Sequence, residues 1–525
     1  QTDGVDAFVD SFRKLIEQVG AKRNVLQSGI IARQHLAMGL HTDAVNNALA
    51  DLDREFVNGR IWSKDGSVWK SFGPTIAKIE QRLGWLDVLK TIDLERLQAL
   101  QDSVRGSHWS AVVLLGMGGS SLAPEVLFRA FGQQPGFPRL LVLDSTDPAQ
   151  IRAVENAVDL PNTLFIVASK SGTTIETDAF YRYFYARTNQ NGAQFIAITD
   201  ADTVLEKLAR DQNFRDVFVN PSDIGGRYSA LSYFGMVPAA LIGLDLKQAW
   251  QNVQQMVAAC ADNVPAVVHP GLTLGAVIGA LGRQGRDKIT IHGTKTLDSF
   301  GAWAEQLIAE SLGKEGKGVV PVVGATVGKP HDYSSDRLFI YLRMDDDSDV
   351  VDMDTGIRTL REAGYPRITL RLPDAYSLFG EFFRWEFATA VAGQMFKVNP
   401  FDEPNVTEAK EATREILDYV QQHGHLPRHK PTIEGGRSRV KVPAGTQTGR
   451  QMRLRGKGMP PLRHGAGMQG EHGDMLIELT VETPVNLTAR QKELLREFEG
   501  IQADNNPQTS GFFQKIKSFW DEMKG

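Results

Sequence analysis

Residues 169–174 combine four hydroxyl side chains with one lysine. They follow a short apolar run and precede a stretch with helical spacing, so we expect them to form the turn between a strand and a helix. Hydroxyl groups, an ammonium group and the free N–H groups of a helix N-terminus together suit a phosphate. A helix cap is the alternative, but a cap needs only one hydroxyl. The segment therefore favours a phosphate site made by Ser169, Lys170, Ser171, Thr173 and Thr174.

A glycine-rich turn lies earlier in the chain, in Gly116-Met-Gly-Gly-Ser-Ser-Leu122. It also follows an apolar run and feeds a helical pattern, so its backbone N–H groups can approach an anion. The spacing differs from the G-x-G-x-x-G of dinucleotide sites, and the lysine of a P-loop is missing. A tight strand-to-helix turn is the alternative interpretation. If the two strands are neighbours, Gly118, Gly119 and Ser120 meet the hydroxyl segment at one edge of the sheet.

Short apolar runs alternate with helix-like segments through the middle of the chain. This alternation predicts right-handed βαβ units and a parallel sheet covered by helices on both faces. The pattern recurs after a helical stretch, so we expect two sheet subdomains, with a long helical segment over 378–423 closing the second. The predicted strands lie at 111–115, 139–143, 163–167, 194–198, 288–292, 338–342 and 368–372.

These patterns divide the chain into four predicted parts. Residues 1–105 are helical in pattern, 106–245 form the first sheet subdomain, and 246–425 form the second with its closing helices. The junction at residues 421–431 is polar and contains two prolines, which is typical of a linker. It leads to a separate predicted domain over 431–525. The predicted fold class of the body is α/β, with two doubly wound parallel-sheet subdomains and flanking helices.

Five motifs, in this order, resemble those of the glucose-6-phosphate isomerase family. Besides the two segments above, they are Gly225-Gly-Arg-Tyr-Ser229, Gln306-Leu-Ile-Ala-Glu-Ser-Leu-Gly-Lys314 and Asn399-Pro-Phe-Asp-Glu-Pro-Asn-Val-Thr-Glu-Ala-Lys410. The helical start and residues 61–70 resemble the isomerase half of bacterial transaldolase–isomerase fusion proteins. The resemblance covers residues 1–425 and implies sugar-isomerase (SIS) type subdomains, a phosphosugar substrate, and neither a cofactor nor a metal.

The resemblance also implies a reaction and roles for four residues. Members interconvert glucose 6-phosphate and fructose 6-phosphate, moving a proton between C1 and C2 through a cis-enediolate. Glu310 matches the family's base, and Arg227 matches the cation beside the developing negative charge. Lys410 matches a lysine associated with the ring oxygen, and Gln306 matches a substrate-contacting glutamine. Outside these motifs, an ordinary helical or surface role is the alternative for each.

Two positions depart from the family's pattern. The family commonly has a histidine in a G-T-N-G-Q-H segment, which reaches the neighbouring subunit's site and helps open the ring. Here Gly328-Lys-Pro-His-Asp-Tyr333 stands in a similar place, so His331 is the candidate, with a plain loop histidine as the alternative. Glu403 stands where the family has Gln, and a carboxylate repels a phosphosugar unless it is paired or protonated. An isomerase of a related sugar with an anion at C6 is therefore the runner-up.

The last block, 431–525, has a different texture and a second resemblance. It is rich in Gly, Arg and Met, alternates apolar and polar side chains over 475–482, and then carries a charged helical pattern. This predicts a small, mostly β domain with a terminal helix. Residues 431–449, 453–459 and 473–488 are similar to the second C-terminal β-domain of the DnaJ co-chaperone family. The resemblance implies client contact or dimerisation, so a chaperone-type binding protein is the alternative function class.

Composition bounds the remaining classes. The chain has 525 residues, a net charge of −5 and a single cysteine, Cys260. This charge argues against dedicated binding of nucleic acid or a membrane surface. One cysteine excludes intramolecular disulfides and fits the cytoplasm, and neither a membrane-length apolar stretch nor a signal-peptide pattern is found. The chain begins at Gln1 rather than Met, so we expect a longer parent, and the isomerase resemblance implies a homodimer.

Overall fold

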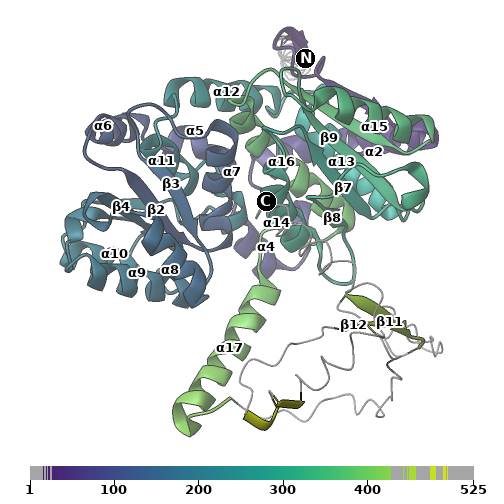
Figure 1. Cartoon of the computed structure of the whole chain (residues 1–525). Coiled ribbons are helices and arrows are strands. Elements are labelled where there is room, and N and C mark those ends of the chain that lie inside the picture. Colours follow the sequence, from purple (N-terminus) through teal and green to yellow (C-terminus); the bar gives the residue numbers. More distant parts are fainter. Residues whose placement is uncertain are drawn as a thin grey trace, which may run out of the picture. The chain divides into compact units, whose positions relative to one another are not determined.

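The structure, a computed structural model, describes residues 26–426 in the body of the chain. It also describes residues 16, 19, 20, 22, 23, 442, 446, 449–456, 473–479, 489–491, 493 and 494, but not the side chains of 405–407 and 410. The chain divides into two compact units, residues 1–417 and 418–525. The first unit contains two five-stranded sheets with helices around and between them (Figure 1).

The first sheet is entirely parallel, in the order β3-β2-β4-β5-β6. Alternate residues of β2 pack into different clusters, with Val112 on one face and Val113 on the other, so both faces are covered. The chain reverses its direction across the sheet between β2 and β4, which makes this the topological switch point. The strands are β2 (Ala111–Gly116), β3 (Arg139–Leu143), β4 (Thr163–Ala168), β5 (Phe195–Asp200) and β6 (Asp216–Asn220).

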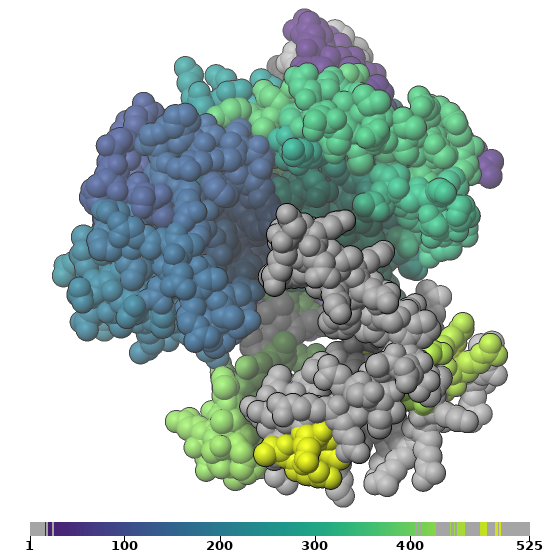
Figure 2. All heavy atoms as spheres, in the orientation of Figure 1, coloured from purple at the N-terminus to yellow at the C-terminus, as the bar shows by residue number. Residues whose placement is uncertain are grey.

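Helices cover the two faces of this sheet in separate groups. Figure 1 shows α8, α9 and α10 together on one face, and α6, α7 and α11 on the other. In Figure 2 this part of the first unit is blue, and the part built on the second sheet is green. The helices are α6 (Leu94–Val104), α7 (Leu122–Phe131), α8 (Pro148–Ala157), α9 (Ile175–Arg187), α10 (Val204–Asp211) and α11 (Tyr233–Leu241).

The second sheet has the order β1-β10-β9-β7-β8, and its first strand comes from the N-terminal part of the chain. It lies in the region 1–105, whose pattern is mainly helical, and it pairs antiparallel with β10 while the other strands are parallel. A four-residue edge strand is too short to show a period of two in the sequence. The strands are β1 (Gln34–Ala37), β7 (Lys288–Gly293), β8 (Val320–Val322), β9 (Arg337–Met344) and β10 (Arg367–Leu372).

The remaining helices pack around α16, a 20-residue helix that is buried on nearly all sides. Gly275 of α13 lets that helix pack closely against α16. A Cβ at this position would stand 2.6 Å from the carbonyl oxygen of Ala388 in α16. No helix in the described part of the chain, α16 included, has the length and apolar character that spanning a membrane requires. These helices are α2 (Thr42–Arg54), α3 (Val57–Trp62), α4 (Gly73–Glu80), α5 (Val88–Thr91), α12 (Leu246–Ala259), α13 (Pro270–Arg283), α14 (Phe300–Leu312), α15 (Val350–Glu362) and α16 (Ser377–Phe396).

The single helical segment predicted over 378–423 is two helices. α16 ends at Phe396, and α17 spans Pro404–His423. Lys397 has a left-handed backbone with φ of 56°, which ends the helix. Pro400 follows three residues later, and a proline has no backbone N–H with which to continue a helix. The break over 397–403 therefore exposes backbone carbonyl groups that a continuous helix would have used internally.

The second unit contains one described pair of strands. β11 (Arg450–Leu454) and β12 (Met475–Leu479) are antiparallel, with Arg450 opposite Leu479. Arg453 forms an ion pair with Asp474, which also accepts a bond from the backbone N–H of Gly456 at 2.8 Å. Together with the two α/β sheets, this small antiparallel element confirms the predicted fold class.

Glu386 carries an unusual carboxyl group in the middle of α16. Its side chain is 1% exposed, and its Oε1 has no hydrogen-bond partner among the described residues. Burial raises the pKa of this carboxyl well above its ordinary value of 4.5, because the charged form loses its hydration. The folded protein thus keeps a proton that the unfolded chain releases near pH 4.5.

Glu386→Gln is expected to stabilise the protein at neutral and alkaline pH. Between pH 4.5 and the raised pKa, the folded state holds one proton more than the unfolded state, so stability falls as pH rises. The slope is about 1.4 kcal/mol per pH unit for one group, and the neutral amide removes it. Thermal unfolding of wild type and variant should coincide near pH 4 and separate by about pH 8. Parallel curves across this range would contradict the assignment.

Candidate active site

The loops after β2 and β4 meet at the switch point of the first sheet. The two strands are hydrogen-bonded neighbours, so their carboxyl ends lie at the same edge, where open α/β sheets bind ligands. A Cβ on Gly119 would stand 2.3 Å from the carbonyl oxygen of Gly226, and one on Gly118 would stand 2.6 Å from Nε2 of Gln306. Glycine at these two positions therefore lets the turn contact two of the other predicted motifs.

The hydroxyl groups of residues 169–174 bond to one another. Oγ of Ser169 lies 2.9 Å from Oγ1 of Thr174, and Oγ of Ser171 lies 2.9 Å from Oγ1 of Thr173. Thr174 is the N-cap residue of α9, yet its side chain makes no capping bond. The hydroxyls and the first N–H groups of α9 thus lie at one place, which is the arrangement that binds an anion.

Lys170 is already balanced by a carboxylate. Its Nζ forms an ion pair with Oδ2 of Asp200, the last residue of β5, and donates to the carbonyl oxygen of Ser222 at 2.9 Å. Burial raises the pKa of Asp200, while the cations of Lys170 and Arg82 act in the opposite direction. Lys170 and Asp200 together therefore add no net charge to this part of the site.

Glu310, near the end of α14, is held by two donors. Its Oε2 accepts a hydrogen bond from Nη1 of Arg227, and its Oε1 accepts one from Nε2 of Gln306, both at 3.0 Å. The side chain of Arg227 is 5% exposed, whereas that of Glu310 is 33% exposed. A buried guanidinium thus orients a carboxylate that remains accessible, as a base that must reach a ligand requires.

Arg227 lies in the short helix η7 (Gly226–Tyr228) and is anchored on further sides. Its Nε donates to Oγ of Ser311 at 3.0 Å. Its Nη2 donates to the carbonyl oxygens of Pro400 at 3.1 Å and Asp402 at 2.9 Å. These carbonyls belong to the break between α16 and α17, so the guanidinium joins three of the predicted motifs.

Lys314 holds the same break. Its Nζ donates to the carbonyl oxygen of Asn399 at 2.8 Å, and to both the carbonyl oxygen and Oδ1 of Asp402 at 2.5 and 2.6 Å. Burial lowers the pKa of this lysine, although Asp402 and Glu403 raise it. The lysine of the Gln306–Lys314 motif thus positions the loop that bonds to Arg227.

One cleft, with a volume of about 550 Å³, gathers most of the predicted site residues. Glu310 shares it with the glycine turn and with the loop that opens α9. The predicted residues that line it are Gly118, Gly119, Ser120, Lys170, Ser171, Thr174, Arg227, Gln306 and Glu310.

Among the described residues, three members of the predicted site do not line this cleft: Ser169, Thr173 and His331. Ser169 is 3% exposed and bonds to Thr174, and Thr173 bonds to Ser171. The side chain of Lys410 lies outside the described residues.

His331 lies in η9 (Pro330–Asp332), where its side chain is 76% exposed and its Nε2 is 3.6 Å from Oδ1 of Asp332. The expected role of His331 is in a neighbouring subunit's site, so it stays a prediction.

Several lining residues were not predicted from the sequence. Asp200 ends β5, so the rule that ligands bind at the carboxyl ends of strands could have found it. Arg82 follows α4 in the N-terminal helical region and belongs to none of the five motifs, so no signal marks it. The other unpredicted members are Met117, Glu176 and Gly226.

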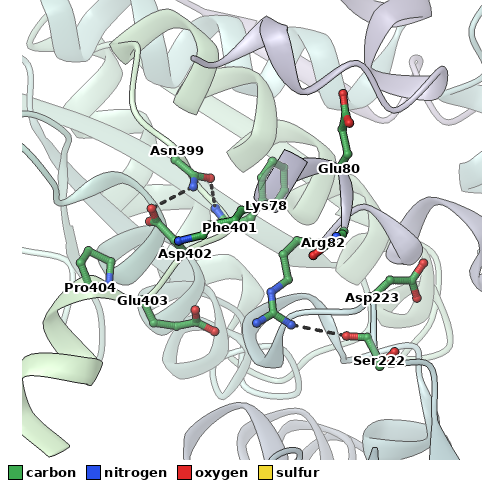
Figure 3. Close-up of a pocket in the computed structure, with 11 residues that line it drawn as sticks. Lys78, Glu80, Arg82, Ser222, Asp223, Asn399, Phe401, Asp402, Glu403 and Pro404 are labelled. Carbon is green, nitrogen blue, oxygen red and sulfur yellow. Dashed lines mark hydrogen bonds between the residues drawn. The ribbon is translucent and has the colours of Figure 1, made fainter. Parts of the chain in front are cut away.

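A second cavity, of about 810 Å³, adjoins the cleft and shares Arg82 and Glu403 with it. Figure 3 shows Arg82 turned toward Ser222, to whose carbonyl oxygen its Nη1 donates at 3.4 Å. On the opposite wall, Nδ2 of Asn399 donates to Oδ2 of Asp402 at 2.8 Å. Arg82 and Glu403 therefore stand between the two cavities.

Two kinds of family model match the chain. Residues 91–319 match the model of phosphoglucose isomerase. Residues 413–484 match that of the DnaJ C terminal domain, and residues 490–522 match that of the chaperone protein DnaJ C-terminal region. Both resemblances found in the sequence motifs are thereby confirmed.

The curated relatives match the end of the chain. The chaperone protein DnaJ of Paracoccus denitrificans (strain Pd 1222) is 85% identical over 95 residues, which are 18% of this chain and 25% of that protein. The DnaJ of Rhodobacter capsulatus is 74% identical over 95 residues, which are 18% of this chain and 23% of that protein. The chain thus spans about a quarter of the length of these relatives.

Two solved structures resemble the body of the chain. A hypothetical protein from Thermus thermophilus aligns with a TM-score of 0.63 and 23% identity, covering 73% of this chain and 99% of that chain. A glucose-6-phosphate isomerase from Chlamydia trachomatis aligns with a TM-score of 0.53 and 18% identity, covering 77% of this chain and 85% of that chain. At these identities the likeness shows the fold.

Proposed function

We propose, from the premise that this chain joins a phosphoglucose isomerase domain to DnaJ C-terminal domains, that its body interconverts glucose 6-phosphate and fructose 6-phosphate. The family match over residues 91–319 supports a sugar phosphate isomerase, and the proposal concerns the particular sugar and mechanism. The observation that supports it most is the carboxylate of Glu310, which Arg227 and Gln306 orient within the cleft that also contains Lys170 and Ser171.

The phosphate of the substrate binds in the loop that opens α9. The hydroxyl of Ser171 turns from Thr173, and that of Thr174 turns from Ser169, to the phosphate oxygens, which also accept from the N–H groups at the start of the helix. Gly118 and Gly119 let the sugar approach the backbone after β2. Binding through the phosphate places C1 and C2 of the open-chain sugar at the other end of the cleft, beside Glu310.

Glu310 then moves one proton. The carboxylate takes the proton from C2 of the aldose, the electrons form the cis-enediolate, and the same carboxyl returns the proton to C1, while the hydroxyl proton passes from O2 to O1. The guanidinium of Arg227 lies beside the negative charge that develops on oxygen, in a position fixed before the reaction by Ser311 and two carbonyls. In this proposal Lys410 assists at the ring oxygen, and His331 opens the ring from a second subunit of a homodimer.

A coupled assay tests this function on the full chain. Fructose 6-phosphate is supplied, and the glucose 6-phosphate that forms is followed by its oxidation with a dehydrogenase and NADP. The proposal expects turnover with saturation by substrate. A full chain that consumes neither hexose 6-phosphate, while its unfolding transition is intact, would overturn the isomerase assignment.

The runner-up within the enzyme class is a related sugar that carries another anion at C6. Glu403 is the reason to test it, because the side chain at this position of the cleft departs from the family pattern. The same chain is therefore assayed by NMR with a panel of aldose 6-phosphates and with the matching C6 carboxylates. A higher kcat/KM for another member of the panel would make that sugar the substrate, while the reaction would still be an aldose–ketose isomerisation.

A second function, client binding or dimerisation, is proposed for the DnaJ-like segment. The identity to DnaJ proteins over its 95 residues favours it. This segment and the active-site cleft belong to different units of the chain. Enzyme activity and chaperone-type activity should therefore separate experimentally.

Truncation after Lys430 is expected to leave kcat/KM within about a factor of two to three of the full chain, since all the described residues of the cleft are retained. The same truncation is expected to abolish suppression of client aggregation, measured by light scattering with a heat-denatured model enzyme. Loss of turnover on truncation would contradict the independence of the two units. Unchanged suppression would contradict a chaperone role of the segment.

A further inference from the structure

Arg82 is the cation of the cleft that has no carboxylate partner among the described residues. Arg227 pairs with Glu310, and Lys170 pairs with Asp200. Arg82 makes one hydrogen bond, to the carbonyl oxygen of Ser222 at 3.4 Å, and forms no ion pair within the described part of the chain. A phosphate dianion entering this cleft therefore meets two cations that already form an ion pair and one, Arg82, that forms none among the described residues.

Arg82 also lies close to the expected phosphate loop. The carbonyl oxygen of Ser222 accepts from Nη1 of Arg82 at 3.4 Å and from Nζ of Lys170 at 2.9 Å. Because the two nitrogens share one acceptor, their separation cannot exceed the sum of these two distances. A single phosphate can bridge such a separation, with one oxygen bonded to each nitrogen.

The backbone around Arg82 is fixed in place. Leu83 forms an isolated antiparallel bridge with Ile224, and the N–H of Gly84 donates to the carbonyl oxygen of Asp223 at 3.0 Å. A Cβ on Gly84 would stand 2.1 Å from Oδ1 of Asp223, so only glycine allows this approach. Arg82 is thereby tied to the loop that runs from β6 to Arg227, and little ordering remains for a ligand to impose.

We propose that Arg82 binds the phosphate group of the substrate together with Lys170, and that it supplies the positive charge that Lys170 alone does not. This inference rests on the proposed phosphosugar function. The guanidinium bonds to two phosphate oxygens through its fork of N–H groups, a geometry that a lysine cannot copy. Arg82 acts on binding and not on the proton transfer, because it belongs to the phosphate end of the cleft.

Arg82→Gln is expected to raise KM for fructose 6-phosphate about 10- to 100-fold, with kcat changed by less than about threefold, since the charge-assisted contact with the phosphate is lost equally in substrate and transition state. Competitive inhibition by inorganic phosphate should weaken by the same factor. Arg82→Lys should recover part of this loss. Lys78→Gln is the matched control, because Lys78 lines only the adjoining cavity and its variant should keep both values.

Direct binding separates failure of this inference from failure of the proposed function. Inorganic phosphate is titrated against the full chain by calorimetry, which needs no turnover. An unchanged phosphate affinity in Arg82→Gln would overturn the inference, as would an equal loss in Lys78→Gln or a fall in kcat at constant KM. A wild type that binds phosphate but isomerises no sugar would overturn the proposed function alone.

A measurement on the unaltered chain covers the case in which Arg82→Gln does not fold. Phenylglyoxal modifies accessible arginines, and mass spectrometry locates the product. Arg82 should react, and inorganic phosphate should protect it, whereas the buried Arg227, which already makes four hydrogen bonds, should react little with or without phosphate. Modification of Arg82 that phosphate does not slow would overturn the inference.

Discussion

Glu310→Gln is expected to lower kcat for fructose 6-phosphate by roughly 10²- to 10⁴-fold, which is the usual contribution of a general base. The amide has the shape of the carboxylate but cannot accept a proton from carbon. Nε2 of Gln306 and Nη1 of Arg227 each bond to one oxygen of Glu310, so one of these donors loses its acceptor in the variant. Arg227 still has Ser311, Pro400 and Asp402 as partners, so the fold should persist.

Binding distinguishes a lost base from a lost site. The dissociation constant of inorganic phosphate should stay within about threefold of wild type, because the phosphate loop is untouched. Wild-type enzyme incubated with substrate in deuterated water should exchange the transferred hydrogen with solvent, and Glu310→Gln should not. Glu305→Gln provides the control, since Glu305 is an exposed glutamate on the same helix. Undiminished turnover in Glu310→Gln would remove Glu310 from the mechanism.

Arg227→Lys should lower kcat by roughly 10²- to 10³-fold, the cost commonly found when one fixed donor to a developing oxyanion is removed. It should also loosen the loop over 399–402. The guanidinium bonds in several directions at once, to Glu310, to Ser311 and to two carbonyl oxygens. An ammonium group keeps the charge but has three donors at one point, so it cannot satisfy all of these acceptors.

The two effects of Arg227→Lys are measured separately. Activity reports the loss of the oriented charge, and thermal unfolding reports the carbonyl groups that lose their donors, each worth about 1–3 kcal/mol when left buried. Arg129→Lys, at an exposed ion pair with Glu125 on α7, is the matched control and should change neither. A variant with wild-type kcat would show that the charge of Arg227, and not its geometry, is all that the reaction uses.

The sequence predicts the parallel strands well and the edges of the fold poorly. The runs at 111–115 and 163–167 lie within β2 and β4, because strands buried on both faces are continuously apolar. β1 has four residues with only Gln34 buried, so its pairing with β10 leaves no local pattern. The break between α16 and α17 falls in a segment whose proline could have indicated it.

The candidate site follows the same division. Motifs on strand ends and on α14 brought Gly118, Lys170 and Glu310 into one prediction, and these residues do line one cleft. Arg82 could not be predicted, because its place depends on a backbone bridge between Leu83 and Ile224, which are far apart in the sequence. Contacts made by the backbone carry no side-chain signature, so only the structure reveals which arginine they position.

The bonds between Arg227, Lys314 and the break after α16 have a consequence for how the protein can diverge. The acceptors at Asn399, Pro400 and Asp402 are mostly peptide carbonyls, which every amino acid supplies. We therefore expect substitutions to be tolerated at the residues that supply these carbonyls. Substitutions of the donors, Arg227 and Lys314, should not be tolerated, because a particular cation is required there. The carbonyl of Asp402 accepts from both Arg227 and Lys314 through its backbone oxygen, so these two bonds do not depend on the side chain of the neighbouring Glu403.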